Sequence, residues 1–192
     1  TTLGDYNTHM DDVCRFIEKV GVRGNLTCMV RDALKKTYQP GELYEFNDAL
    51  GAEEFRRNLD LFDRWHNQAN GRIKILFGPQ AADFVSADLL LKIQKAAKER
   101  KTKIHLHVQQ GDRETDQVMR RYGKRPTKFL EDLGYLDEDL IAVHLTDCTD
   151  EEAMTIARHG ASMAVNPGCI GLVDGLVCPS LAFQKAGGNV AL

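Results

Sequence analysis

The chain has 192 residues, of which 43% are hydrophobic and 28% charged, proportions that are ordinary for one globular domain with a substantial core. A formal net charge of −3 gives no electrostatic reason to expect nucleic acid, and no apolar run reaches the roughly 18 residues that cross a bilayer. The five cysteines are scattered without a C-x-x-C pair, which excludes a zinc ribbon or thioredoxin motif and favours reduced cysteines in a cytoplasmic protein.

Short apolar or β-branched runs alternate with stretches of helical periodicity along the chain. We predict strands at residues 1–4, 24–30, 72–77, 103–108, 140–145, 161–165 and 189–192. Helices are predicted at 10–20, 86–100 and 149–159, with Ser86 as the N-cap of the second. The third opens with Thr149 and, three residues later, Glu152, which is the pattern of a capping box.

This alternation predicts βαβ units and a parallel sheet in an α/β fold. Seven strand candidates without a long polar linker favour a barrel over two small domains. The alternative is an open doubly wound sheet, but no G-x-G-x-x-G follows any of the strands. We therefore predict a single domain over residues 1–192 that forms part of a (β/α)8 TIM-type barrel.

Both ends of the sequence fall within or beside predicted strands. An open barrel with apolar strands at its edges exposes unpaired backbone groups, which natural domains avoid. We therefore expect that the chain is truncated at both ends and belongs to a larger barrel. For the same reason we expect it to self-associate as a homo-oligomer.

Two histidines mark the strand ends that carry chemistry in barrels. His105 and His107 are two residues apart on one predicted strand and so face the same side of the sheet. His107 lies at the C-terminal end of that strand, and His144 has the same place on the next one. Neutral imidazole is a good ligand for zinc or iron, so we predict His107 and His144 as metal ligands. The alternative is a pair of core histidines held by hydrogen bonds.

The segment 104–150 (IHLHVQQGDRETDQVMRRYGKRPTKFLEDLGYLDEDLIAVHLTDCTD) resembles the fifth and sixth strands of amidohydrolases in the cytosine deaminase, guanine deaminase and chlorotriazine hydrolase branch. The pieces TTLGDY, VRG, FGPQAADFVSADLL and residues 160–192 resemble other parts of the same family, in matching order and spacing. The resemblance implies approximately the second to eighth barrel strands, without the first strand and the end of the eighth. It also implies one bound divalent metal, with zinc as the first choice and iron as the alternative.

Carried over position by position, the resemblance makes His107 the fifth-strand ligand and His144 the sixth-strand residue. The first-strand H-x-H and the eighth-strand aspartate of the family have no counterpart in the chain. Neither Asp5 nor Asp174 lies at the place of that aspartate.

The sequence departs from the family pattern where deaminating members carry H-x-x-E. Here the fourth residue is Gln110, which forms hydrogen bonds but cannot act as a general acid near neutral pH. We predict that Gln110 binds substrate. Asp147, three residues beyond His144, is the candidate catalytic residue, orienting substrate or relaying a proton; a solvated loop carboxylate is the alternative. A further departure is Ile170, where relatives often have asparagine.

The resulting hypothesis is a metal-dependent amidohydrolase that cleaves a C–N or similar bond of a small cyclic or amide substrate by metal-activated water, in the manner of a deaminase. The 192 residues alone are expected to be inactive, because a first shell lacking several ligands binds metal weakly. The expected partner is a small molecule, with no nucleic acid and no membrane. The rival hypothesis is a non-catalytic binding or structural module derived from the same barrel, which Gln110 favours.

Overall fold

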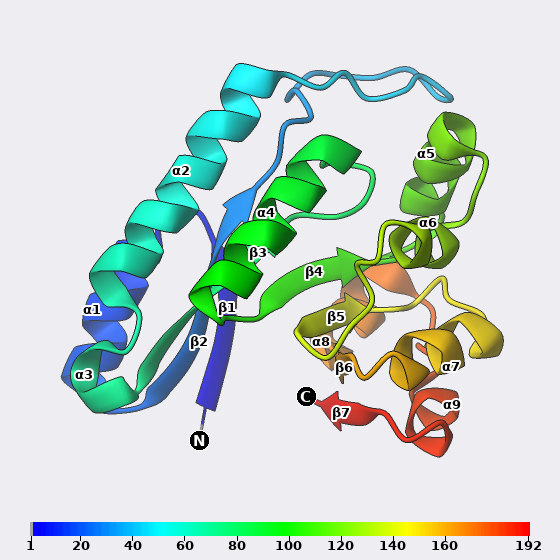
Figure 1. Ribbon diagram of the computed structural model, residues 1–192. Helices are drawn as coiled ribbons and strands as arrows, with labels where there is room; N and C mark the ends of the chain where they lie inside the picture. The colour runs from blue at the N-terminus through cyan, green and yellow to red at the C-terminus, as the bar shows by residue number, and fades with distance from the viewer. Residues whose placement is uncertain (1) are drawn as a thin grey trace.

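A computed structural model describes residues 2–192 (Figure 1). Seven parallel strands form one sheet in which each strand pairs with the next along the chain. They are β1 (Thr2–Asn7), β2 (Arg23–Val30), β3 (Ile73–Pro79), β4 (Ile104–Val108), β5 (Leu140–His144), β6 (Ser162–Ala164) and β7 (Asn189–Ala191). Each predicted strand is confirmed, with ends that differ by a few residues; Thr1, the start of the first predicted run, lies outside the described residues.

Helices connect successive strands, as the predicted βαβ pattern requires (Figure 1). They are α1 (Met10–Val20), α2 (Asp48–Trp65), α3 (Gln68–Gly71), α4 (Ala87–Arg100), α5 (Asp112–Tyr122), α6 (Pro126–Asp132), α7 (Asp150–Arg158), α8 (Pro167–Cys169), the π-helix η1 (Ile170–Asp174) and α9 (Ser180–Lys185). Within residues 2–192, no helix combines the length and the apolar character needed to cross a bilayer.

The sheet order separates the two predicted architectures. Strands follow one another in sequence order from β1 to β7. In a doubly wound sheet, by contrast, the order in which successive strands are added reverses at a switch point. Within the described residues, β1 and β7 each pair with a single neighbour, so the sheet curls without closing. The fold is therefore part of a TIM-type barrel, as predicted.

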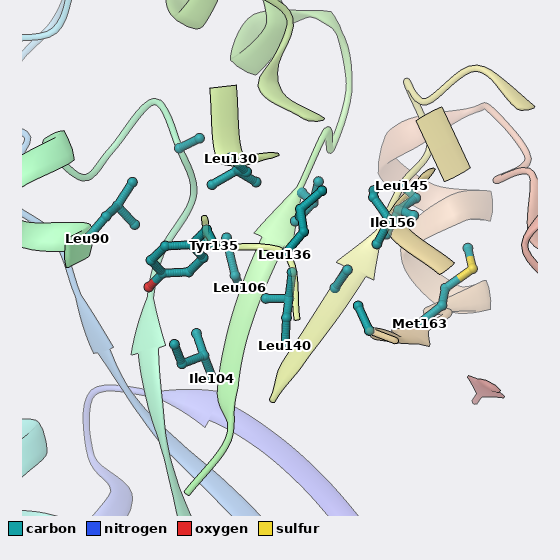
Figure 2. Close-up of a cluster of buried hydrophobic side chains, with 14 of the residues drawn as sticks. Leu90, Ile104, Leu106, Leu130, Tyr135, Leu136, Leu140, Leu145, Ile156 and Met163 are labelled. Carbon is teal, nitrogen blue, oxygen red and sulfur yellow. The ribbon is translucent and has the colours of Figure 1, made fainter. Parts of the chain in front are cut away.

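The core lies between the sheet and its helices. On β4 the residues Ile104, Leu106 and Val108 are buried in this core. Figure 2 shows Ile104 and Leu106 beside Leu90, Leu130 and Tyr135. Alternate residues of a strand point to opposite faces, so the intervening His105 and His107 face the concave side of the curled sheet. Burial of the aliphatic stripe thus directs the two imidazoles toward the candidate site.

The two predicted helix N-caps, at α7 and α4, differ in outcome. Thr149 and Glu152 form both hydrogen bonds of a capping box at the start of α7, as predicted. Ser86 does precede α4, but its side chain does not cap that helix. Its hydroxyl and its backbone N–H both donate to the buried Asp32 carboxylate, two residues beyond the end of β2, so the hydroxyl is not available to cap the helix.

The longest helix, α2, is an addition to the predicted elements. Its residues Phe55, Leu59 and Phe62 recur at helical spacing and pack against the core. Asn47 caps its start by accepting a hydrogen bond from the Leu50 backbone N–H, 2.9 Å away.

Candidate active site

The two predicted metal ligands lie side by side. His107 is the penultimate residue of β4 and His144 the last residue of β5, and these strands pair in parallel register with Val108 opposite His144. The ring centroids are 5.2 Å apart and the rings are inclined by 22°, so they are nearly stacked. The sheet register therefore brings together two imidazoles that are 37 positions apart in sequence (144 − 107).

The orientation of His107 is set by the loop that follows β3. Its Nδ1 lies 2.7 Å from the backbone carbonyl oxygen of Gln80. A carbonyl oxygen only accepts, so Nδ1 carries the hydrogen and Nε2 of the neutral ring presents its lone pair. Histidine ligands of metals commonly hold their other ring nitrogen in this way.

The backbone around His144 is unusual. His144 and Leu145 have φ values of 77° and 57°, and Gln109, just beyond β4, has a φ of 49°. Non-glycine residues rarely adopt this left-handed conformation, which costs on the order of 1–3 kcal/mol per residue. The two turns hold each other through hydrogen bonds from Leu145 N–H to the Val108 carbonyl and from Asp147 N–H to the Gln109 carbonyl. Strain of this kind is typical of functional strand ends.

Asp174, from the π-helix η1, reaches the same place. Its Oδ2 lies 3.7 Å from His144 Nδ1, and the two side chains are only 3% and 4% exposed. Neither atom has a hydrogen-bond partner within the described chain, and such orphaned buried atoms are rare. The other oxygen, Oδ1, accepts a 3.3 Å hydrogen bond from the Gln110 side chain. Asp174 thus contacts two predicted site residues although it does not stand at a strand end.

Burial keeps the imidazoles neutral. The pKa of His107 falls to about 4, chiefly because the ring is removed from water, and the pKa of His105 falls to about 3 for the same reason. Burial also lowers the pKa of His144, against the opposing effect of Asp174. Tyr6 of β1 packs on both β4 imidazoles, with ring centroids 4.9 Å from His105 and 4.5 Å from His107. Neutral rings retain the lone pairs that metal binding requires.

A cavity of about 270 Å³, here named the inner cavity, opens beside His107. It is lined by Tyr6, Met29, Gln80, Ala81, Phe84, His107, Gln110 and Arg113. Gln110, the predicted substrate-binding residue, therefore lies on this cavity together with His107. Gln80 was not anticipated from the sequence, and its buried Oε1 has no hydrogen-bond partner among residues 2–192.

Asp147 lies beyond the end of β5 and faces other groups. Its Oδ2 accepts a hydrogen bond from the Thr115 hydroxyl and lies 3.6 Å from the Arg125 guanidinium. Arg125 also binds the Asp147 carbonyl oxygen and the Glu152 carboxylate. The catalytic role of Asp147 remains a prediction, and these contacts favour a part in positioning the β5 turn.

Two residues that line the inner cavity, Gln110 and Arg113, contact a pair of buried acids that the sequence did not reveal. Asp83 and Glu114 have fully buried carboxyl groups, and each has one oxygen without a partner in the described chain. Glu114 accepts a 3.3 Å hydrogen bond from the Gln110 backbone N–H, and Asp83 accepts one of 3.0 Å from Arg113. Burial, and then the nearby Asp83, raise the pKa of Glu114 to about 8. In sequence, both residues look like ordinary solvated charges.

The residues present fit part of a metal shell. His107 offers a fixed Nε2 lone pair, and orphaned polar atoms of His144 and Asp174 are buried together. Over residues 2–192, however, no three His, Cys, Asp or Glu side chains converge on one position that would suit a metal ion. Two neutral imidazoles are compatible with a divalent metal, but they do not complete its coordination.

Comparison with known proteins places these features in a family. The model of the amidohydrolase family matches residues 1–182. The chain is 32% identical to 5-methylthioadenosine/S-adenosylhomocysteine deaminase from Thermoanaerobacter pseudethanolicus, across 100% of the chain and 42% of that protein. It is 29% identical to 5'-deoxyadenosine deaminase from Methanobrevibacter smithii, across 87% of the chain and 36% of that protein.

Solved structures agree on the architecture. An adenosine deaminase from Xanthomonas campestris with bound zinc superposes on the whole chain with a TM-score of 0.84 and 25% identity, over 41% of its own length. Atrazine chlorohydrolase from Arthrobacter aurescens, complexed with zinc, gives a TM-score of 0.81 at 20% identity, over 45% of its length. The chain thus spans less than half of the proteins it matches. By the family match over residues 1–182, on a curled parallel sheet with paired imidazoles at its strand ends, the chain belongs to the amidohydrolase family.

Proposed function

We propose that the chain is part of a metal-dependent hydrolase that cleaves a C–N or similar bond of a small cyclic or amide substrate, as deaminases do. The observation that carries the proposal is the stacked pair His107 and His144 at neighbouring strand ends of an amidohydrolase barrel. The names of the similar proteins, which are deaminases of adenosine derivatives, support a nucleoside-like substrate. A small substrate also suits an inner cavity of about 270 Å³.

His107 and His144 are the residues that would hold the metal, and zinc is favoured over iron because two similar structures contain zinc. When bound, such a metal supplies an activated water near neutral pH. With only these two imidazoles to offer, the 192 residues alone would bind metal weakly and show no turnover.

The remaining side chains would bind and orient the substrate. Gln80 Oε1 is free to accept a hydrogen bond from a substrate N–H, and the Gln110 amide can both donate and accept. Gln110 cannot supply a proton, so that task needs a carboxyl group. Asp147 is the proposed residue. Asp174, which contacts Gln110 and lies near His144, is a second candidate on the basis of those contacts.

Metal content tests the proposal. Because the expected binding is weak, purified chain is dialysed to equilibrium against buffered zinc, with no desalting step, and its bound zinc is measured by elemental analysis beside the double variant His107→Ala/His144→Ala. The matched control is His159→Ala, which removes a largely exposed imidazole. Zinc retained by the parent chain and the control, but lost from the double variant, is expected. Equal zinc in all three would refute the assignment of these ligands.

The rival proposal is a non-catalytic module, and Gln110 is the observation that favours it. Under that proposal, the chain retains no zinc and binds a nucleoside such as adenosine equally well with or without His107 and His144. Zinc-dependent binding of adenosine would instead favour the hydrolase. Elemental analysis for zinc and equilibrium dialysis with adenosine on the same samples therefore distinguish the hydrolase from the non-catalytic module.

The proposal also includes a cytoplasmic location and self-association through the open edges of the sheet. β1 and β7 present unpaired backbone groups in the described chain, and such edges promote association. Light scattering at increasing protein concentration measures this directly, and a mass that stays at one chain would count against it.

A further inference from the structure

A second cavity adjoins the inner one. This outer cavity, of about 480 Å³, is formed mainly by the segment that follows β2 and is lined by Arg31, Leu34, Lys35, Lys36, Thr37, Tyr38, Tyr44 and Phe84. Phe84 also lines the inner cavity, so one side chain forms a wall of both. The two cavities therefore lie next to each other, with Phe84 between them.

The wall of the outer cavity is aromatic. Tyr44 stacks on Phe84 with ring centroids 5.1 Å apart and an angle of 3°, and Tyr38 packs against Tyr44 at 4.8 Å. On the side of the inner cavity, the Arg113 guanidinium lies 4.6 Å from the Phe84 centroid. Because Tyr44 and Arg113 occupy the faces of Phe84, a planar ring in the outer cavity would contact Tyr38 and Tyr44, whose aromatic surface favours such rings.

Hydrogen bonds to α5 hold this wall in place. The Gln117 side chain accepts from the Tyr44 backbone N–H at 3.0 Å and donates to the Glu42 carbonyl at 2.8 Å. Arg121 donates to the Tyr44 carbonyl oxygen. The Tyr38 hydroxyl donates to a backbone carbonyl of its own loop. A loop fixed in this way is preorganised for binding, so little ordering is required when a ligand arrives.

The outer cavity holds two cations that form no salt bridge in the described chain, although the Glu54 carboxylate lies near Arg31 and accepts a hydrogen bond from its backbone N–H at 3.2 Å. Lys36 is paired with two carboxylates, Glu42 and Glu45. Arg31 and Lys35, in contrast, have no acidic side chain within ion-pair distance anywhere in residues 2–192. Two cations beside an aromatic wall suit a ligand that carries a negative charge next to a ring.

We propose that the outer cavity is a second subsite, which binds a planar ring bearing a carboxylate or phosphate group through Tyr38, Tyr44 and the cations Arg31 and Lys35. This subsite rests on the proposed function in one respect: it would hold the distal part of the same substrate whose reacting part lies beside His107. The two parts of the substrate would then lie on opposite sides of Phe84, which lines both cavities.

Binding of simple aromatic anions tests the subsite without any reaction. Phenyl phosphate and benzoate are titrated into the chain by calorimetry, with excess chelator to keep metal absent, and inorganic phosphate and phenol serve as the half-probes. The double variant Arg31→Gln/Lys35→Gln removes both charges and keeps side-chain bulk. Its matched control is Lys92→Gln/Lys95→Gln, which removes two cations from the exposed side of α4.

The expected result is that at least one aromatic anion binds tenfold or more tightly than both half-probes. That advantage is lost in Arg31→Gln/Lys35→Gln and kept in the control. Comparison of phenyl phosphate with benzoate identifies the preferred anion. Equal affinity of the double variant and the control, binding no tighter than that of inorganic phosphate, or no binding at all would overturn the proposal.

A further arm separates this subsite from the proposed hydrolase. The variant His107→Ala/His144→Ala removes the candidate metal ligands, and it should bind aromatic anions as the parent chain does. If the parent chain binds no zinc but binds aromatic anions, the metal assignment alone is refuted. Loss of anion binding in the histidine variant but not in Arg31→Gln/Lys35→Gln would place the anion in the inner cavity and refute the second subsite.

Discussion

Replacing Glu114 by glutamine should change how the stability of the protein depends on pH. The Glu114 carboxyl group is fully buried, and burial followed by repulsion from Asp83 raises its pKa to about 8 from the usual value of 4.5. The folded chain therefore holds the proton more tightly than the unfolded chain does. This contribution to stability is fully present below the unfolded pKa and is lost as the pH rises through the folded pKa.

The size of the effect follows from proton linkage. Where the folded chain holds one more proton than the unfolded chain, the free energy of unfolding falls by about 1.4 kcal/mol per pH unit. Between pH 5 and 8 this amounts to roughly 3–4 kcal/mol, a large part of the total stability of about 5–15 kcal/mol typical of a domain. Asp83, whose pKa is also raised by burial, acts in the same direction.

Glutamine resembles the protonated acid in shape and lack of charge, and its carbonyl oxygen can still accept from the Gln110 N–H. Urea unfolding of the wild-type chain and of Glu114→Gln is measured from pH 5 to 9 by circular dichroism. The control is Glu18→Gln, at an exposed position on α1. Wild type and control should lose stability as the pH rises, and Glu114→Gln should lose much less. Parallel pH profiles for all three proteins would refute the buried-acid account.

Three other substitutions test the packing that positions the site. Leu106→Ala removes a fully buried side chain behind the two β4 imidazoles and should cost about 2–5 kcal/mol in urea unfolding, whereas Leu91→Ala, at a site 42% exposed, should cost little. Thr149→Ala removes the capping box of α7 and should cost about 1 kcal/mol by the same measurement; no change would mean that the cap adds nothing to stability. Gly78→Ala places a methyl group against Thr27 Cγ2 and 2.8 Å from both the Cys28 carbonyl oxygen and the Tyr6 ring, so it should cost about 1–3 kcal/mol and shift the His107 ring resonances in NMR spectra. Gly171→Ala is its control, since a methyl group there meets no atom within 4 Å, and equal effects of the two changes would contradict the close packing of Tyr6.

The sequence alone determined the architecture and the position of the two histidines, because both depend on local periodicity. Alternation of short apolar runs with helical segments indicated the parallel sheet. The two-residue period of a strand placed His105 and His107 on one face. Parallel order then put the ends of β4 and β5 at the same edge, so His107 and His144 had to be neighbours.

Only the tertiary structure decided which other groups join that site, because their contacts link distant segments without a repeating pattern. Asp174 reaches His144 from a π-helix beyond β6, and the Gln80 carbonyl selects the tautomer of His107. Asp83 and Glu114 acquire their raised pKa values only when packing removes both from water. Such effects depend on burial and on distances between side chains, which a linear sequence does not specify.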